Sequence, residues 1–192
     1  MRAAPVGLGW PGDPFLCGCE VAALTHGHPT GWLASGCMAF IIAGVLAGRD
    51  LESAIELAMS ELSNYPDHEE TMSALERALA FEALGIGNAE EVECLGDGWV
   101  AEEALAIAVF CSMISSDFES AVRLAVTHSG DSDSTGSITG QIMGTLYGVD
   151  AIPEKWLDKL ELRDVIDRVA CDLHDALSKA DQPFDLDRYP AE

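Results

Sequence analysis

The stretch AEEALAIAVFCSMI, residues 101–114, decides the fold class. After Glu102 and Glu103 it is apolar on nearly every side of the helix that its length and composition predict. A helix that is apolar all round must be enclosed by other elements, whereas a surface helix keeps one polar face. We therefore expect residues 101–114 to form a central helix surrounded by further helices.

Segments on either side of this stretch also carry apolar residues at helical spacing. Asp50 is placed to cap a helix with apolar residues from Leu51 to Leu62, and Pro66 lies beyond its expected end. No strand-like alternation stands out, so we predict an all-α protein. The other expected stripes are Met72, Leu75 and Leu79; Phe118, Ala121, Val122 and Ala125; and Val165, Ile166, Val169, Leu173 and Leu177.

The segment from Val21 to Gly48 contains no Asp, Glu, Lys or Arg, which raises the question of a membrane span. It also contains two histidines, a proline and several glycines, and its continuous apolar part, roughly residues 33–47, is short for a span. We therefore expect a buried core helix here and no membrane partner.

The charge balance is strongly acidic. Ten basic residues against thirty-three acidic ones give a net charge of -23. This balance argues against binding to a nucleic-acid backbone or to an anionic membrane surface. A ligand that carries phosphates would need metal ions or backbone amides to offset the same field.

The six cysteines include no C-x-x-C pair, and several lie in apolar runs, so we expect buried, reduced thiols. The first fourteen residues contain proline, glycine and an acid where a secretory signal has its apolar segment. The expected location is the cytoplasm. No interdomain linker stands out, so we expect residues 1–192 to form a single domain, with residues 181–192 as a loop-like tail.

Residues 128–136, HSGDSDSTG, crowd carboxylates and hydroxyls into a glycine-flanked turn. Asp131 and Asp133 are one residue apart and can point at one place, and the hydroxyl of Ser134 or Thr135 adds a neutral oxygen of the kind that Mg²⁺ accepts. A helix expected to follow would favour this negative charge at its N-terminus. The pattern indicates a site for a hard cation.

The turn fits three other interpretations to different degrees. Asp131, Asp133 and Ser134 have the side chains that cap helices. A calcium loop requires a bidentate Glu at its twelfth position, which here is Ile142. D-x-D-x-T also resembles the nucleophile loop of haloacid dehalogenase-type phosphatases, but that loop follows a buried strand, and residues 118–127 are predicted to be helical.

Glycines recur every four residues after the turn, at 136, 140, 144 and 148. Glycine disfavours a helix on propensity alone. We expect a helix here that is stabilised by tertiary contacts, with a bare face that leaves room for another backbone to approach closely.

Four blocks of the sequence then stand in a recognisable order: MRAAPVGL at 1–8, THGHPTG at 25–31, LGDGWVAEEAL at 95–105 and GDSDS at 130–134. With these blocks the chain resembles the ADP-ribosylglycohydrolase family, which is related to dinitrogenase reductase-activating glycohydrolase. The likeness extends to about Leu173. It implies a compact, orthogonal multi-helix domain.

The resemblance also implies roles for particular residues. In the family motif G-D-x-D-[ST], two aspartates and the following hydroxyl coordinate a pair of Mg²⁺ ions, and these positions are Asp131, Asp133 and Ser134 here. His26 matches a position that lines the ADP-ribose pocket, and Trp99 matches one beside the nucleotide, where its ring can stack. A structural hydrogen bond for His26 and simple packing for Trp99 are the alternatives.

The family domain begins before the Met-Arg block, and its first half supplies a second metal cluster, a candidate catalytic acid and a phosphate-binding loop. The chain is therefore expected to lack the N-terminal helices of the domain and to hold about half of the two-metal site, and we assign no catalytic residue.

The function implied by the resemblance is Mg²⁺-dependent hydrolysis of the glycosidic bond between ADP-ribose and a modified protein side chain. ADP-ribose or an ADP-ribosylated protein is the expected partner, and a separate N-terminal half is a further possible one. The alternative is a helical module that binds metal, ADP-ribose or another protein without catalysis.

Overall fold

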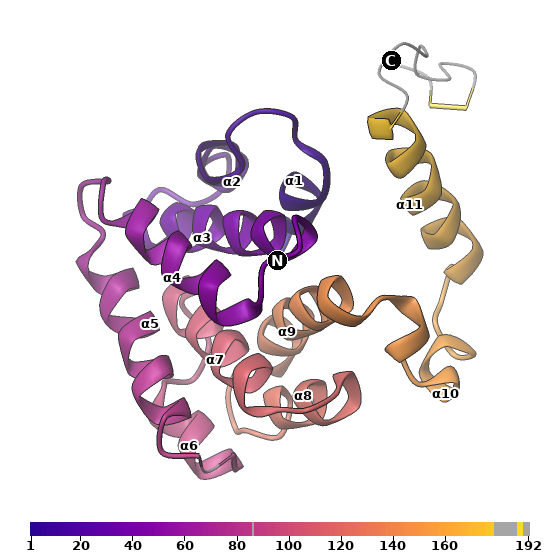
Figure 1. Ribbon diagram of the computed structural model, residues 1–192. Helices are drawn as coiled ribbons and strands as arrows, with labels where there is room; N and C mark the ends of the chain where they lie inside the picture. Colours follow the sequence, from indigo (N-terminus) through magenta and orange to yellow (C-terminus); the bar gives the residue numbers. More distant parts are fainter. Residues whose placement is uncertain (86, 179–187, 190–192) are drawn as a thin grey trace. The chain divides into compact units, whose positions relative to one another are not determined.

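Every regular element in the described part of the chain is helical, which confirms the all-α prediction (Figure 1). The computed structural model describes residues 1–85, 87–178 and 188–189. The chain divides into two compact units, Met1–Pro153 and Glu154–Glu192, and each is described by itself. The expectation of a single domain stays a prediction. The first unit contains α1 (Ala4–Gly9), α2 (Pro14–Ala23), α3 (Pro29–Leu46), α4 (Leu51–Leu62), α5 (Glu69–Glu82), α6 (Ala89–Cys94), α7 (Ala101–Ile114), α8 (Phe118–Ala125), α9 (Ser132–Tyr147) and the 3-10 turn η1 (Val149–Ala151).

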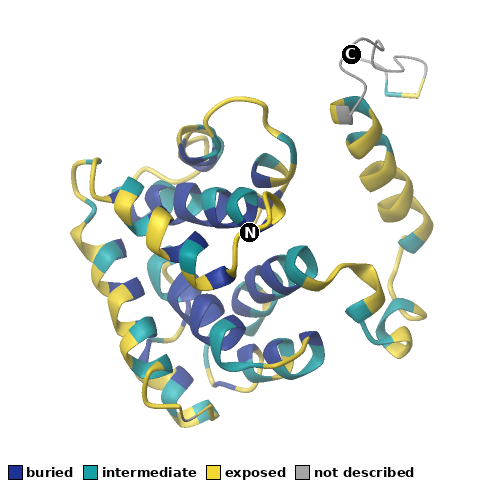
Figure 2. Cartoon of the chain, in the orientation of Figure 1, coloured by how far each residue is buried: buried dark blue, intermediate teal, exposed yellow. Residues whose placement is uncertain are grey.

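Helix α7 is the centre of the first unit, as its sequence predicts. All of its residues from Ala104 to Ser112 are buried, and it packs against α3, α5, α8 and α9. Figure 2 shows buried residues concentrated on α3 and α7 and exposed residues on the outer sides of α4 and α5. The core is thus built around two apolar helices with amphipathic helices outside them.

Helix α3 is a core helix. Among the described residues it is the one helix that is long and apolar enough to cross a membrane, and 56% of that stretch is buried inside the protein. It crosses α2 at glycines on both helices. A Cβ added to Gly18 would lie 2.9 Å from the carbonyl oxygen of Ser35, and one added to Gly36 would lie 2.5 Å from Cys19 Sγ. The two backbones therefore approach as closely as atoms allow.

Side chains cap the N-termini of several helices in the way the sequence predicts for Asp50. Asp50 accepts a hydrogen bond from the backbone N–H of Ser53 at 2.8 Å, and Asp117 accepts one from Ser120 at 2.8 Å. These bonds satisfy donors that a helix leaves free at its start. They fix where α4 and α8 begin.

The glycine-spaced helix α9 corrects one expectation. Among the described residues, no backbone atom outside α9 lies within 4 Å of a Cβ added at Gly140 or Gly144. A Cβ at Gly140 would lie 3.9 Å from Phe118 Cζ and 4.0 Å from Val122 Cγ2, which is ordinary contact with side chains of α8. The bare face makes room for these larger side chains. Gly148 ends α9 with a φ of 76°, which a residue with a side chain rarely adopts.

The cysteines are only partly as expected. All six are free. Cys19, Cys37 and Cys111 are buried, and burial raises the pKa of Cys19 and of Cys111 to about 12, which keeps these thiols protonated. Cys17 is half-buried, and Cys94 and Cys171, on α6 and α11, are exposed.

The second unit contains α10 (Glu154–Leu157) and α11 (Arg163–Ser178), and α11 is the last helix that the sequence predicts. The expected loop-like tail lies outside the described residues, apart from Arg188 and Tyr189. These two donate hydrogen bonds to the carboxylate of Asp172 on α11, at 3.0 and 2.7 Å.

Candidate functional site

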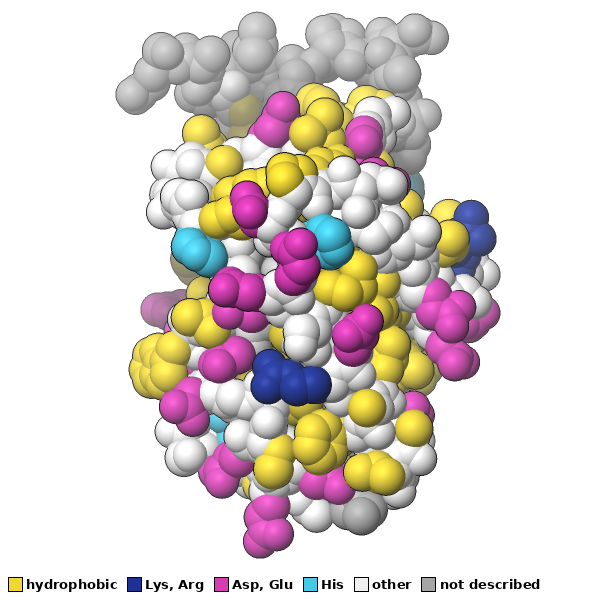
Figure 3. Space-filling view, turned by 90° about the vertical axis from the view of Figure 1, so that its left-hand side faces the viewer, with side chains coloured by type: hydrophobic (Ala, Val, Ile, Leu, Met, Phe, Trp, Pro, Cys, Tyr) yellow, Lys and Arg dark blue, Asp and Glu magenta, His cyan; other side chains and the backbone are white. Residues whose placement is uncertain are grey.

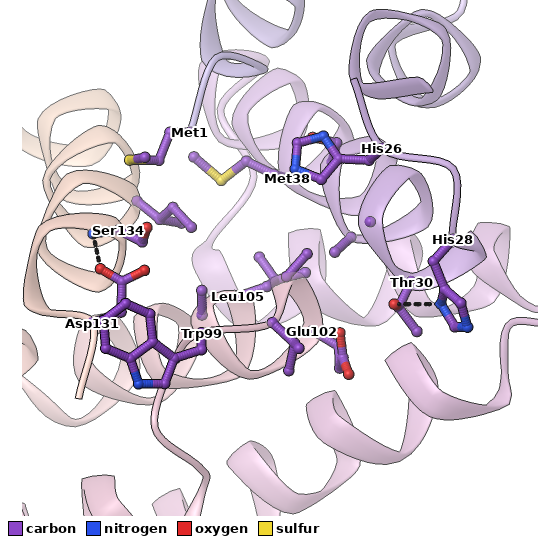
Figure 4. A pocket seen from close by; sticks show the side chains of 18 of the residues that line it. Met1, His26, His28, Thr30, Met38, Trp99, Glu102, Leu105, Asp131 and Ser134 are labelled. Carbon is purple, nitrogen blue, oxygen red and sulfur yellow. Dashed lines mark hydrogen bonds between the residues drawn. The ribbon is translucent and has the colours of Figure 1, made fainter. Parts of the chain in front are cut away.

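A cavity of about 960 Å³ opens in the first unit, at the upper end of the range of about 300–1,000 Å³ that is typical of ligand pockets (Figure 4). The loop before α3, the first half of α3, the loop before α7, and the starts of α7 and α9 supply most of its wall. Four of the five site residues predicted from the sequence line it: His26, Trp99, Asp131 and Ser134. Asp133, the fifth, is exposed beside the cavity.

The acidic turn forms the N-terminus of α9, and both of its aspartates approach the same backbone N–H. Ser134 N lies 3.4 Å from Asp131 Oδ1 and 3.0 Å from Asp133 Oδ1. Hydrogen bonding with the Asp133 carboxyl, and with Ser134, holds the pKa of Asp131 below its usual value. The same contact with Asp131 raises the pKa of Asp133. The two carboxyls thus shift each other's pKa in opposite directions.

The geometry fits part of a cation site as well as a helix cap. Two adjacent carboxylates repel each other unless a proton or a cation lies between them, and a hydroxyl from Ser134 stands on the same turn. Such oxygen donors suit Mg²⁺. Within the described ranges, no group of three His, Cys, Asp or Glu side chains is placed to hold a metal ion. Asp131, Asp133 and Ser134 are thus oxygen donors of the kind that can bind a hard cation, and their assignment as metal ligands stays a prediction.

A buried histidine supports the acidic turn. His128 Nδ1 accepts a hydrogen bond from the backbone N–H of Gly130 at 3.1 Å, so its other nitrogen carries the proton and donates to Thr135 Oγ1 at 3.0 Å. The Thr135 hydroxyl in turn donates to the carbonyl of Ala125 at 2.7 Å. Through Thr135, His128 therefore joins the end of α8 to the first turn of α9, and the sequence analysis assigned it no role.

The loop at residues 95–100 lies directly against the acidic turn. The backbone N–H of Asp131 donates to the carbonyl of Asp97 at 2.7 Å. Gly130 faces that same carbonyl so closely that a Cβ on it would lie 1.9 Å from the oxygen. This contact brings together two loops more than thirty residues apart in sequence and places Trp99 beside Asp131, as Figure 4 shows.

Trp99 is 72% exposed, although it lines the cavity. A tryptophan that only packs would bury far more of its ring, because tryptophan is highly buried on average. The exposed ring is free to stack on a flat ligand. The predicted place beside a nucleotide agrees with this position and stays a prediction.

His26 lies at the other side of the cavity, beside Met38 (Figure 4). Its Nδ1 is within hydrogen-bond distance of Thr25 Oγ1, at 2.9 Å, and of the Ala22 carbonyl, at 3.3 Å. The side chain of Arg2 donates to the same Thr25 hydroxyl. The imidazole therefore makes a structural hydrogen bond and also faces the cavity, so both interpretations of His26 fit the structure.

Sequence reasoning missed three charged residues of the cavity wall, Arg2, Glu70 and Glu102. Arg2 is the one Lys or Arg among the described lining residues. The sequence does mark Arg2, because no other Lys or Arg precedes Arg49. Glu102 also lines the cavity, and its Oε2 is buried without a hydrogen-bond partner among the described residues. The sequence gives no signal that separates Glu102 from Glu103 beside it.

The haloacid dehalogenase alternative requires a strand immediately before the acidic turn. The structure instead places α8 there, followed by a short loop. A nucleophile at the end of a buried strand is thus absent from this part of the described chain.

The ADP-ribosylglycohydrolase family model matches residues 1–183. ADP-ribosylarginine hydrolase Tri1 of Pseudomonas putida (strain GB-1) is 30% identical over 124 residues, which are 62% of this chain and 33% of that protein. ADP-ribosyl-[dinitrogen reductase] glycohydrolase of Rhodospirillum rubrum is 25% identical over 163 residues, or 85% of this chain and 49% of that protein. ADP-ribosylhydrolase ARH3 of Homo sapiens is 31% identical over 102 residues, or 47% and 28%.

This chain therefore aligns with no more than about half the length of these three relatives, 49% in the longest case. The family match itself is not confined to one motif. It extends from the Met-Arg block through the acidic turn and beyond α9, over nearly all of the helical structure. On that ground the chain belongs to the ADP-ribosylglycohydrolase family.

Proposed function

We propose that this chain supplies the ADP-ribose pocket and one part of the metal site of a Mg²⁺-dependent ADP-ribosylhydrolase. Such an enzyme hydrolyses the glycosidic bond between ADP-ribose and a modified protein side chain. The observation that carries the proposal is the single cavity that brings His26, Trp99, Asp131 and Ser134 together. The comparisons support the same class of substrate, because the relatives are named for removing ADP-ribose.

The cavity wall divides by chemistry in a way that suits ADP-ribose. Arg2 and His26 both form hydrogen bonds with the Thr25 hydroxyl, which holds them at one side of the cavity. There they can bind the diphosphate. Trp99 offers a flat ring for the base or a ribose. Asp131 and Ser134 lie next to Trp99, so a ribose between them would stand close to the metal ligands (Figure 4).

In this proposal Asp131, Asp133 and Ser134 hold Mg²⁺ at the start of α9. When bound, Mg²⁺ polarises ribose hydroxyls and the attacking water. The side chains of this chain bind the nucleotide, orient the ribose and keep the carboxylates in place. Proton transfer requires a positioned acid or base, and we assign that role to no residue of this chain.

The incomplete set of metal ligands favours a second candidate function. Because the described residues include no cluster of three metal-binding side chains, the chain alone can serve as a module that binds ADP-ribose. In that case the hydrolase forms only when another polypeptide segment adds the remaining ligands.

The surface charge bears on both candidates. Figure 3 shows one face of the molecule with many Asp and Glu side chains and few Lys or Arg side chains. With a net charge of -23, the protein repels an anionic ligand at long range. Binding of a diphosphate therefore depends on Arg2 and on cations held inside the cavity.

The test is thermal unfolding with Mg²⁺, ADP-ribose or both, followed by an assay for ADP-ribose release from ADP-ribosylated peptides. A ligand at one hundred times its Kd stabilises the folded state by about 2.7 kcal/mol. We expect the wild type to melt at a higher temperature with Mg²⁺ and higher again with both ligands. An unchanged melting temperature with every ligand would contradict both candidates.

Asp131→Asn separates the metal site from the helix cap. Asparagine caps a helix as well as aspartate does, but it removes the negative charge. We expect the melting temperature without ligand to stay near that of the wild type, and the rise with Mg²⁺ to disappear. Asp117→Asn, at the cap of α8, is the matched control and should keep the full response. If Asp131→Asn kept its response to Mg²⁺, Asp131 would be only a cap.

A further inference from the structure

Glu103 makes an unusual set of hydrogen bonds at the start of α7. Its Oε2 accepts the backbone N–H groups of Asp97 and Gly98, each at 3.1 Å. A glutamate three residues after the helix cap commonly reaches back to the cap itself. Here the carboxylate reaches further back and ties down the loop that carries Trp99.

The loop is shaped around this carboxylate. Gly96 and Gly98 both have positive φ, 127° and 75°, where a residue with a side chain is strained. A Cβ on Gly96 would lie 2.3 Å from Glu103 Cδ. The loop can therefore wrap the carboxylate only because both positions are glycine.

The same peptide segment holds the acidic turn. Asp97 gives its N–H to Glu103, and its carbonyl accepts the N–H of Asp131 at 2.7 Å. Asp97 is thus bonded on one side to Glu103 of α7 and on the other side to Asp131 of the acidic turn. The bond from Asp97 to the Glu103 carboxylate is charge-assisted, and such bonds are stronger than neutral ones.

A second connection runs in parallel. Glu93 Oε1 accepts the backbone N–H of Ser129 at 3.2 Å. A Cβ on Gly98 would lie 2.9 Å from Thr135 Cγ2 on α9. The loop before α7 and the turn before α9 therefore meet at several points. Glu103 is the charged group that anchors the loop before α7.

We propose that Glu103 is a positioning residue that holds the Trp99 loop and the Asp131 turn in one fixed arrangement. Glu103 is not among the residues that line the cavity, whereas Glu102 is. It acts through Asp97, and loss of its carboxylate loosens the nucleotide side and the metal side of the cavity together. As far as it concerns Mg²⁺ and ADP-ribose, this inference rests on the proposed function.

The first experiment requires no ligand. Hydrogen exchange of the intact chain is followed in segments 96–100 and 128–134 for the wild type, Glu103→Ala and Glu103→Gln. We expect Glu103→Ala to speed exchange in both segments by about tenfold, as expected for the loss of a hydrogen bond. Glu103→Gln keeps an acceptor oxygen at the same reach and should restore most of the protection. Asp50→Ala, which removes the cap of α4, should leave both segments unchanged.

Faster exchange in segment 96–100 alone would overturn the proposal, because Glu103 would then brace only its own loop. If Glu103→Ala fails to fold, Glu103→Asp takes its place, since a side chain shorter by one methylene still loosens both bonds.

The second experiment measures Kd for Mg²⁺ and for ADP-ribose by calorimetry. We expect Glu103→Ala to weaken both by about tenfold and Glu103→Gln to recover them, while Asp50→Ala lowers the melting temperature without changing either Kd. Unchanged affinities in Glu103→Ala would contradict a role in positioning. If the wild type bound neither ligand, the proposed function would fail, and the exchange experiment would still decide whether Glu103 joins the two loops.

Discussion

Gly130→Ala should be among the most destabilising of the small substitutions in this chain. A Cβ at Gly130 would lie 1.9 Å from the carbonyl oxygen of Asp97, 2.6 Å from its carbonyl carbon and 2.8 Å from its Cα. All three are backbone atoms, so no side-chain rotation can relieve the contact. The loop before α7 and the turn before α9 must move apart by more than 1 Å to restore ordinary carbon contacts, which are about 3.5–4.0 Å.

The cost of this movement follows from what it breaks. The hydrogen bond from Asp131 N to Asp97 O is now 2.7 Å long and would be lost, at about 1 kcal/mol. Forcing a methyl group into a filled space costs about a further 1–3 kcal/mol. The sum is roughly 2–4 kcal/mol, and at about 2–4 °C for each kcal/mol in a protein of this size, the melting temperature should fall by roughly 5–15 °C.

Gly140→Ala is the matched control, with the opposite expected sign. A Cβ at Gly140 meets Phe118 Cζ at 3.9 Å, which is an ordinary contact. Alanine in place of a glycine inside a helix stabilises it by about 0.5–1 kcal/mol. Scanning calorimetry of both variants gives the comparison. A Gly130→Ala variant that melted within about 2 °C of the wild type, or a Gly140→Ala variant that melted far below it, would refute this account of the two sites.

Two further predictions concern the cap of α4 and the exposed tryptophan. Hydrogen bonds from the backbone and hydroxyl of Ser53 hold the pKa of Asp50 below its usual value. The cap therefore stabilises the protein at pH values above the ordinary pKa of about 3.9, and this effect is lost as the pH falls through the lowered pKa. The melting temperatures of Asp50→Ala and the wild type, measured from pH 6 down to pH 2, should therefore converge in acid, and a constant difference would contradict this role. Trp99→Ala should leave the melting temperature almost unchanged, because the side chain is 72% exposed, and should weaken ADP-ribose binding by about 5- to 150-fold if the ring stacks on the base, with Trp99→Phe weakening it less.

The helices were largely predictable because the signals that specify them are local. The bounds of α7 are those expected from the stretch at 101–114, and Asp50 caps α4 as its sequence position predicts. A stripe of apolar residues at helical spacing depends only on the chain within a few turns. It also identifies the buried face, as the buried residues of α4 show.

Contacts between distant segments were not predictable in the same way. The resemblance to the family pointed to His26, Trp99 and Asp131, and the structure brings them to one cavity. Nothing local distinguishes Glu103, which ties down a loop, from Glu102, which lines the cavity. Such differences depend on which way each side chain leaves the helix and on which segment lies there, so tertiary structure is needed to see them.

The close crossing of α2 and α3 has a consequence for the entropy of ligand binding. The two backbones pack closely at Gly18 and Gly36. This packing holds each helix in place against the other, and it therefore also fixes the two ends of the turn that joins them. His26 stands on that turn with its ring already held by Thr25 and Ala22. A ligand that contacts this imidazole loses little freedom in ordering it, so more of the contact energy remains as affinity. Two glycines inside the core thus preorganise a side chain at the edge of the pocket.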